Sequence, residues 1–268
     1  AFSDTNLKNL IFPDKVKYIG ERAFGSNDSL ANVTWPSSLE HIGGYAFSSA
    51  ALTTLDLPTS LKTLSGCSFE YCDDLTSVTI PNGVEHIGGH TFYGCHGLTE
   101  LTIPASVTSI EEGFANNCNK LRNVFWNASV NVPYNGISEY ALLYVNTDAE
   151  ITVDECWKNV IKNGVAQSTI TIQAENNQKF AILKEFTAPE VVYTRHFNGT
   201  TTPGVSSGWK TIVLPFTPDS IYHESKGRVA PFNSGVEDAK PFWLRELTAD
   251  GFVDVTSITP DKAYIIAM

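Results

Sequence analysis

The residues of this chain best suited to acid–base or metal chemistry are its histidines, because imidazole binds metal ions and exchanges protons near neutral pH. His86, His90 and His96 lie close together, but no carboxylate or thiol completes a metal site at the usual ligand spacing. We therefore interpret the histidines as surface residues, with metal binding as the alternative. The six histidines are His41, His86, His90, His96, His196 and His223.

Cysteine is the second reactive residue type, and three of the five cysteines recur at a fixed interval. Cys72, Cys95 and Cys118 follow one another at intervals of 23 residues. An odd number of cysteines without a CxxC pair is a poor framework for disulfides or structural zinc. The interval predicts a column of small, buried, free thiols, with disulfides or metal ligation as the alternative. Cys67 and Cys156 fall outside this series.

Carboxylates are frequent, yet their arrangement does not indicate catalysis. A glycosidase needs two carboxyl groups about 5–10 Å apart in a cleft, and neighbouring residues on a turn, such as Glu111 and Glu112, point apart. The chain has no GxSxG, HExxH, P-loop or strand-to-helix GxGxxG motif. We therefore predict that the protein is no enzyme and needs no cofactor or metal ion.

The composition excludes several classes of protein. Of 268 residues, 42% are hydrophobic, which is enough for a folded core. The net charge of −11 is spread over both halves, and no Lys/Arg cluster follows a nucleic-acid backbone or an anionic membrane. No run approaches the roughly 18 consecutive apolar residues of a membrane span. The opening AFSDTN lacks a signal-peptide pattern, so we expect a mature or trimmed part of a longer protein.

The strongest feature of the chain is an internal repeat with a period of 23 residues in most units. Its pattern is L-x-x-[LV]-x-ϕ-P-x-x-[LV]-x-x-[IL]-G-x-x-A-F, where ϕ is apolar, and the second unit is one residue short. Because one unit buries too little surface alone, stacked units must share a continuous core. The units begin at Leu7, Leu30, Leu52, Leu75 and Leu98, and a sixth opens at Leu121.

Each unit predicts two short strands and a turn. Apolar residues at the first, fourth and sixth places indicate the first strand, and the following proline ends it because proline has no N–H to donate. A second extended run follows, and Gly20, Gly43 and Gly88 then permit a sharp turn. In the fifth unit Phe114 comes one place early, so we expect an altered turn there and no lost rung.

The predicted core consists of columns in which one position of each unit stacks on the same position of the next. The first column holds the conserved-looking aromatic of each unit and comprises Phe24, Phe47, Phe69 and Phe92. The second ends the first strand of each unit and comprises Phe12, Trp35, Leu57, Ile80, Ile103 and Trp126. We interpret both tryptophans as core residues, with a sugar or cofactor platform as the alternative.

The fourth unit, LTSVTIPNGVEHIGGHTFYGCHG, resembles the BspA-like leucine-rich repeats of bacterial surface proteins, of the Bacteroides surface-antigen and Treponema type. The resemblance covers roughly residues 7–160 and implies a mainly β, right-handed leucine-rich-repeat solenoid without long helices. The chain departs from the family pattern at Ser65 and Glu111, where the family has Gly, and at Asn27, where it has Cys. Residues 141–145 and 157–160 resemble the rung that closes such arrays.

The repeat fades before the last third of the chain, so we predict two domains. Residues 1–172 form the solenoid with its closing cap, and residues 173–268 form a small all-β, sandwich-like C-terminal domain whose last strand is cut short. Aromatic and β-branched runs between Gly, Pro, Asn and Ser turns indicate this domain. Its segments 193–195, 208–216 and 262–266 resemble a β module found after such arrays in surface proteins of gut Bacteroidetes.

The predicted ligand site is the outward face of the first strand in each unit. Polar residues in matching positions form flat columns that can hydrogen-bond an extended partner, and the alternative is an ordinary solvated sheet face. The predicted binding residues are Asn9, Asn32, Thr34, Thr54, Asp56, Ser77, Thr79, Glu100, Thr102, Asn123 and Phe125. A further column alternates in charge, which favours correct strand register, and comprises Lys17, Glu40, Lys62, Glu85 and Thr108.

The resemblance implies a cell-surface adhesion protein, extracellular or anchored at the outer surface, that binds a host or matrix macromolecule through the repeat face. We expect a monomer whose partner is a protein or a polysaccharide and not a nucleic acid. One alternative is a glycan-binding module that uses Trp209, Tyr222 or Trp243 of the C-terminal domain. Another is a passive structural spacer.

Overall fold

The computed structural model describes residues 2–135, 140–174 and 182–195, together with six separate strands after residue 195. Every regular element in these residues is a β-strand, so the predicted absence of long helices is confirmed for them. The chain divides into two compact units, residues 1–173 with 183–194, and residues 174–182 with 195–268. The separate folding of a domain that begins at residue 173 remains a prediction.

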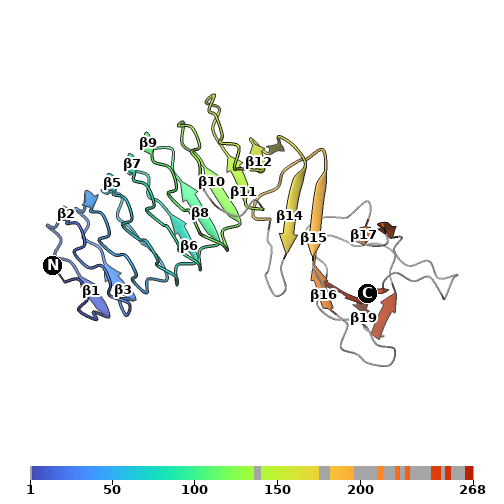
Figure 1. The fold of residues 1–268 in the computed structure, drawn as a ribbon, viewed down its shortest axis with the longest axis horizontal. Helices are drawn as coiled ribbons and strands as arrows, with labels where there is room; N and C mark the ends of the chain where they lie inside the picture. Colours follow the sequence, from blue (N-terminus) through green and yellow to red (C-terminus); the bar gives the residue numbers. More distant parts are fainter. Residues whose placement is uncertain are drawn as a thin grey trace. The chain divides into compact units, whose positions relative to one another are not determined.

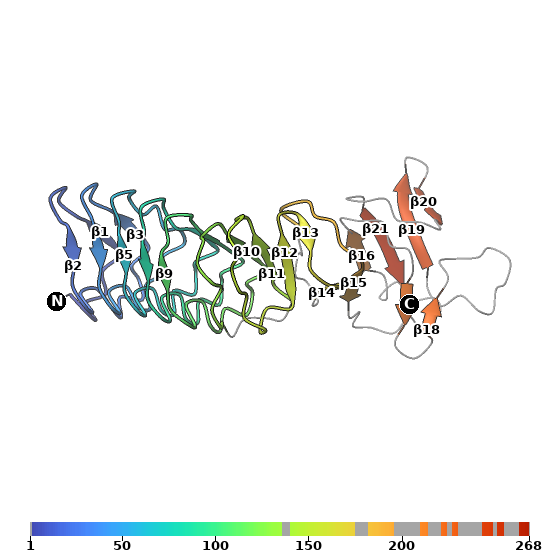
Figure 2. The ribbon, with the colours of Figure 1, turned by 90° about the horizontal axis from the view of Figure 1, so that it is seen from above.

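The first unit is a β-solenoid of about eight turns, in which successive repeats lie side by side (Figures 1 and 2). On one face the first strands of the repeats run parallel in chain order, and β13 (Val165–Ala166) turns back antiparallel to β12. The parallel strands are β1 (Asn9–Ile11), β3 (Asn32–Thr34), β6 (Ser77–Thr79), β8 (Glu100–Ile103), β10 (Asn123–Trp126), β11 (Leu142–Val145) and β12 (Asn159–Lys162).

The third repeat interrupts this first face. Residues 52–57 form no strand, so the face consists of a two-stranded sheet, β1–β3, and a six-stranded sheet that begins at β6. The second repeat places four residues between Phe47 and Leu52, where the first, third and fourth repeats place five between phenylalanine and leucine. Leu52, Leu55 and Leu57 still point into the core, but these residues form no strand, so the first sheet is interrupted there.

A second parallel sheet runs without interruption along another face of the solenoid. Its strands are only two residues long, because each repeat turns again directly after them. The five strands are β2 (Tyr18–Ile19), β4 (His41–Ile42), β5 (Thr63–Leu64), β7 (His86–Ile87) and β9 (Ser109–Ile110). Their register places His41, Thr63 and His86 in one column, as the sequence predicted.

The prolines between the two sheets form a turn as well as ending a strand. The carbonyl of Pro58 accepts a hydrogen bond from the N–H of Leu61 (3.1 Å), and that of Pro81 accepts one from Val84 (3.2 Å). The other three repeat prolines accept the same bond from the residue three places later. The proline thus ends one strand and directs the buried first residue of the next extended run into the core.

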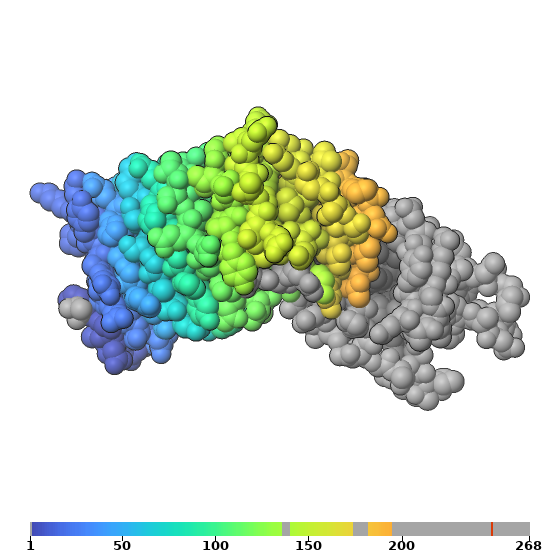
Figure 3. Space-filling view, turned by 45° about the horizontal axis from the view of Figure 1, so that its top comes forward, coloured from blue at the N-terminus to red at the C-terminus, as the bar shows by residue number. Residues whose placement is uncertain are grey.

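Stacked phenylalanine rings form the centre of the core. The rings of Phe24, Phe47, Phe69 and Phe92 lie nearly parallel, with centroids 5.5, 5.7 and 5.8 Å apart. Trp35 places its ring edge-on against Phe47, with centroids 5.0 Å apart. The predicted columns are therefore confirmed, and the buried repeats form one continuous cluster. Figure 3 shows the repeats on the outside as successive bands of colour.

The fifth repeat keeps its backbone and exchanges two side chains. Gly113 and Asn117 have positive φ angles of 67° and 62°, in the same positions as His90 and Gly94 one repeat earlier. The expected altered turn is therefore wrong. Phe114 and Ala115 have changed places relative to the usual Ala-Phe pair, both stay buried, and Phe114 packs against Trp126 at 6.0 Å. The phenylalanine column ends here because Ala115 occupies its position.

The repeat glycines are required by the close approach of neighbouring turns. We predicted that Gly20, Gly43 and Gly88 permit a sharp turn, but none of them has a positive φ. A Cβ on Gly88 would lie 2.4 Å from the N of Gly66, and one on Gly43 would lie 2.7 Å from the N of Glu21. Gly20, in the first complete repeat, has no atom within 4 Å of such a Cβ.

The cysteine column is confirmed as a set of buried, free thiols. Each thiol caps a main-chain carbonyl inside the solenoid. Burial raises the pKa of Cys72 to about 12, so this side chain stays protonated at neutral pH. Cys67 and Cys156 are also free thiols but are half-buried. The Sγ atoms of Cys72, Cys95 and Cys118 donate to the carbonyls of Phe47 (3.3 Å), Phe69 (3.2 Å) and Phe92 (3.1 Å).

Residues after the last regular repeat close the solenoid. Trp157 is buried and its Nε1 donates to the carbonyl of Pro133 (3.2 Å). The Asn159 side chain donates to the Thr171 carbonyl (2.9 Å) and accepts from the Thr171 N–H (2.7 Å). These bonds attach β14 (Ile170–Ala174), which pairs with β15 (Val191–Arg195), to the end of the array.

The second unit contains two antiparallel sheets among the described residues. The four-stranded sheet has the order β16 (Lys210–Val213), β21 (Ala263–Ala267), β19 (Trp243–Thr248) and β20 (Gly251–Asp254). The two-stranded sheet joins β17 (Ile221–His223) to β18 (Gly227–Val229). The regular structure described in this unit consists of β-strands, as expected. That these strands form a sandwich remains a prediction.

Replacing Phe92 by alanine should lower the free energy of unfolding by about 3–5 kcal/mol, because the ring is fully buried between two neighbouring rungs. Phe2→Ala is the matched control, since Phe2 stacks on Phe24 but is 60% exposed, and it should cost far less. Thermal or urea unfolding measures both. A loss below about 1 kcal/mol for Phe92→Ala would show that the column does not hold the rungs together.

Thiol labelling should separate the buried column from the other cysteines. In the folded protein Cys72, Cys95 and Cys118 should resist a maleimide reagent, because all three side chains are fully buried and the reagent cannot reach them. After unfolding in denaturant without reductant, mass spectrometry should find all five cysteines labelled. If these three cysteines were labelled only after treatment with a reductant, they would be disulfide-bonded, which would contradict their assignment as free thiols.

Ser49→Gly should stabilise the array by up to about 1 kcal/mol, because Ser49 has a φ of 59°, a region that costs other residues free energy and glycine little. Gly94 already occupies the equivalent position two repeats later. Ser48→Gly is the control and should destabilise, since Ser48 has no positive φ. Equal effects of the two changes on the unfolding midpoint would contradict this assignment of strain.

Candidate functional site

The predicted binding residues stand in columns because the strands of the first face pair in register. Asn9 is opposite Asn32, and Ser77, Glu100 and Asn123 follow one another in the six-stranded sheet. The neighbouring column aligns Thr34 with Ile11, and Thr79 with Thr102 and Phe125 in the same way. Thr54 and Asp56 lie between the two sheets, in the repeat that forms no strand.

The columns are open to solvent over the first four repeats and become covered beyond them. The exposed members are Asn9, Asn32, Thr34, Thr54, Asp56, Ser77 and Thr79. Glu100, Thr102 and Phe125 are half-buried, and Asn123 is only 4% exposed. Treating Asn123 and Phe125 as open surface positions is therefore wrong, and the open face is shorter than predicted.

The covering at this end involves residues from much later in the chain. Phe125 stacks on Tyr144, with centroids 5.0 Å apart, and Tyr144 in turn contacts the ring of Phe186 at 6.4 Å. The Nζ of Lys184 donates to the Oδ1 of Asn146 (2.6 Å). Burial raises the pKa of the Tyr144 hydroxyl. Residues 182–187 therefore lie against β11 and remove its outward side chains from solvent.

At the open end, part of the polar surface is engaged with itself. The Nδ2 of Asn32 donates to the Oδ1 of Asn9 (2.9 Å), so two amides on neighbouring strands form a short ladder. Each amide keeps further donor and acceptor positions. Thr54, Asp56, Ser77 and Thr79, all exposed, lie next to this ladder along the array.

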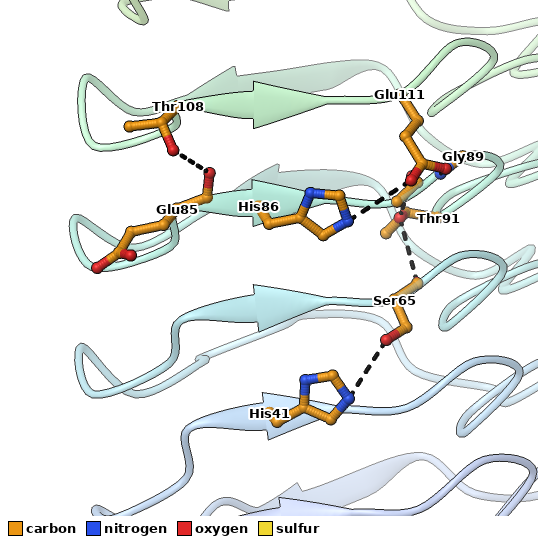
Figure 4. Close-up of polar contacts among 9 residues, drawn as sticks. His41, Ser65, Glu85, His86, Gly89, Thr91, Thr108 and Glu111 are labelled. Carbon is orange, nitrogen blue, oxygen red and sulfur yellow. Dashed lines mark hydrogen bonds and ion pairs between the residues drawn. The ribbon is translucent and has the colours of Figure 1, made fainter.

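The second sheet presents histidines and charged residues, shown in Figure 4. The Nε2 of His86 lies 3.7 Å from the Oε1 of Glu111, whose Oε2 accepts the N–H of Gly89 (2.8 Å). The Nε2 of His41 lies 3.3 Å from the Ser65 hydroxyl. Each of these contacts joins one repeat to the next. These contacts support the interpretation of His41 and His86 as surface residues of the array.

The alternating charges of the predicted register column pair as expected. The Nζ of Lys17 lies 2.6 Å from Glu40, and the Nζ of Lys62 lies 3.2 Å from Glu85. The hydrogen bond to Glu40 raises the pKa of Lys17, and the same bond lowers the pKa of Glu40. These groups are highly exposed, so the pairs favour the register without contributing much to stability.

A group of aromatic side chains on the turns of the second to fourth repeats was missed by the sequence reasoning. Tyr45, Tyr71, His90, Tyr93 and His96 occupy variable positions of the repeat, so no recurring column marks them. The available signal was the gathering of rings in these three repeats. The same positions hold no aromatic ring in the first repeat (Arg22, Gly25, Ser26 and Asp28) or the fifth (Gly113, Asn116, Asn117 and Asn119).

Three aromatic residues of the predicted C-terminal domain were considered as a glycan site. Trp209 lies outside the described residues, while Tyr222 and Trp243 lie in β17 and β19. Within the described ranges, no three His, Cys, Asp or Glu side chains are grouped so that they could hold a metal ion. A membrane-spanning helix, one both long and apolar enough for that role, is likewise not found in the described part of the chain.

The chain was compared with known sequences and solved structures. No curated protein sequence matches the chain. A leucine-rich-repeat protein of T. pallidum has a solved structure that is 21% identical, over 57% of this chain and 78% of that one, with a TM-score of 0.46. A leucine-rich cell surface protein of Faecalibacterium prausnitzii is 20% identical, over 70% of this chain and 60% of its own, with a TM-score of 0.34.

A leucine-rich-repeat protein of Bacteroides ovatus is 14% identical, over 69% of this chain and 67% of its own, with a TM-score of 0.23. The family comparison concerns the repeats themselves. Residues 1–122 match the BspA type leucine-rich repeat region in six copies. Over these residues the solenoid described above is therefore similar to the BspA type leucine-rich repeat region.

Proposed function

We propose that the protein is an extracellular or surface-anchored adhesion protein of a bacterium, which binds a host or matrix macromolecule through the strand face of its repeats. The proposal is supported by the BspA-type repeats of residues 1–122, a repeat type that we associated with bacterial surface proteins. The observation that carries it is the exposed polar surface of the first four repeats, where seven of the predicted binding residues are open to solvent. We further propose that the protein acts as a monomer.

The chemistry of this face suits an extended partner. Asn, Ser and Thr side chains provide both donors and acceptors, and their short side chains lose little conformational entropy when a ligand orders them. Neighbouring rungs are about 4.8 Å apart, so the same groups recur along the face at regular steps. A protein strand or a polysaccharide chain presents polar groups at comparably regular steps, whereas a small molecule would use only one or two rungs.

The face has few side chains of the type that dominate tight interfaces. Aromatic residues and arginine supply most hot spots, and Phe125 is engaged with Tyr144. Ile11, which is 77% exposed, is the large apolar side chain left on these columns. We therefore expect modest affinity per molecule, which suits an adhesin that is present in many copies on one surface.

Free thiols are unusual in an extracellular protein, because disulfides form there readily. The buried column is compatible with such a location, since protonated thiols inside a closed core react slowly with oxidants. The three column cysteines are fully buried, and each is hydrogen-bonded to a phenylalanine carbonyl. This arrangement is therefore compatible with an extracellular location, and the proposal of that location rests on the repeat type alone.

A variant with lysine at Thr54, Asp56, Ser77 and Thr79 should lose binding to a panel of immobilised extracellular-matrix proteins and polysaccharides. All four side chains are exposed, so stability should change by no more than about 1 kcal/mol. Binding is measured by surface plasmon resonance and stability by thermal unfolding.

The matched control carries lysine at Asp14, Ser37, Thr59 and Asn82, which are exposed positions directly after the repeat prolines. Both variants add the same charge, so non-specific attraction affects them equally. The control should bind as the unmodified protein does. If the four-lysine variant of the strand face still bound the partner, that face would be excluded as the binding site. The second unit would then be the leading candidate.

A further inference from the structure

A separate surface lies on the turns that follow the second sheet, in the second, third and fourth repeats. We call it the aromatic patch. Rings of the third and fourth repeats contact one another, and Tyr45 lies on the matching turn of the second repeat. At the positions of Tyr93 and Tyr71 the first repeat has Gly25 and Ser26, and the fifth has Asn116 and Asn117. The patch comprises Tyr45, Tyr71, His90, Tyr93 and His96.

Tyr71 is the centre of the patch. Its ring meets Tyr93 edge-to-face, with centroids 5.4 Å apart and an interplanar angle of 89°, and it lies 6.4 Å from the ring of His96. Tyr93 also contacts His90, with centroids 5.4 Å apart. Tyr71 nevertheless remains 41% exposed. Four rings from two repeats thus form one surface with an accessible tyrosine in its middle.

The backbone holds Tyr71 in this position. Tyr71 itself has a φ of 56°, and Gly94 beneath it has a φ of 66°. A Cβ on Gly94 would lie 2.6 Å from the Cδ1 and Cε1 atoms of Tyr71, so only glycine leaves room for the ring. The ring is therefore fixed before any ligand arrives, which reduces the entropy lost on binding.

Polar groups surround the rings. The Nδ1 of His96 lies 2.7 Å from the Oδ1 of Asp73, and the guanidinium of Arg22 lies 5.0 Å from the centre of the Tyr45 ring. Glu70 directly precedes Tyr71 and is half-buried. Burial raises the pKa of its carboxyl, and the charge of His90 opposes that shift. Carboxylates, imidazoles and phenol hydroxyls offer donors and acceptors within reach of anything that stacks on Tyr71.

The size of the patch argues against a protein partner. It covers three repeats, a length of about 10 Å at the spacing of the rungs, whereas a stable protein interface buries about 800 Å² on each side. An exposed aromatic ring with polar groups at its edge suits a sugar, whose C–H face packs on the ring while its hydroxyls bond at the periphery. The carboxylates Glu70 and Asp73 disfavour anionic sugars.

We propose that the aromatic patch is a binding site for a short neutral oligosaccharide, which stacks on Tyr71 and hydrogen-bonds to Glu70 and Asp73. This site is distinct from the strand face of the proposed function, because it lies on the turns that follow the second sheet and uses other residues. It also differs from the glycan site considered above for the C-terminal domain. The protein would then carry two recognition surfaces on one array.

An array of immobilised neutral, sialylated and sulfated oligosaccharides provides the test, followed by calorimetry with the best neutral sugar in solution. The full chain should bind neutral sugars, and Tyr71→Ala should weaken that binding roughly tenfold or more, as expected for removal of a central aromatic contact. Tyr71→Phe should retain most of the binding, because it keeps the aromatic ring on which the sugar stacks and removes only the hydroxyl. Thermal unfolding confirms that each variant is folded.

Tyr18→Ala is the matched control, because Tyr18 is a 67% exposed tyrosine of the second sheet outside the patch, and it should bind as the unmodified protein does. The four-lysine variant of the strand face should also keep sugar binding, which distinguishes this site from the proposed function. No binding to any neutral sugar, binding to anionic sugars alone, or binding unchanged by Tyr71→Ala would each overturn the proposal. If Tyr71→Ala abolished binding to a matrix protein and the chain bound no sugar, the proposal would be overturned as well.

Discussion

Hydrogen bonding between the main chains of successive repeats is the interaction on which the rest of this solenoid depends. No rung can satisfy its own strand N–H and C=O groups, so each must lie in register with its neighbours. The register brings identical positions together, which stacks the phenylalanines at 5.5–5.8 Å and places each column thiol on a carbonyl of the preceding rung. It also brings turns so close that Gly43 and Gly88 cannot carry a side chain.

The same constraint explains why two sequence irregularities have different consequences. The residue missing after Phe47 shortens the turn that leads into the next strand, and residues 52–57 lose their place in the first sheet. The second sheet remains continuous through β5, because the turn at Pro58 is the same as in the other repeats and β5 pairs in register with β4. In the fifth repeat the length is unchanged, so Phe114 and Ala115 exchange places without disturbing the backbone.

The parts of the structure that repeat could be predicted from the sequence, because every inward position is specified several times. The core columns, the free thiols and the His41–Thr63–His86 alignment follow from the period alone. The covering of β11 could not be predicted, because Lys184 and Phe186 lie far from Tyr144 in the chain and belong to no repeat. The positive φ angles at Tyr45 and Tyr71 could not be predicted either, since tyrosine rarely adopts them.

Recognition in such an array depends on the positions that the register leaves free. Inward residues are fixed by their neighbours, so differences between repeats concentrate on the outside, where they affect stability little. The strand face varies gradually and offers similar polar groups at each step, which suits a long partner. The aromatic patch differs sharply from the repeats on either side of it, and its central ring requires glycine at position 94. This local departure from the repeat, with a ring held in place by the adjacent turn, is the structural basis on which we propose that the patch binds a ligand of its own.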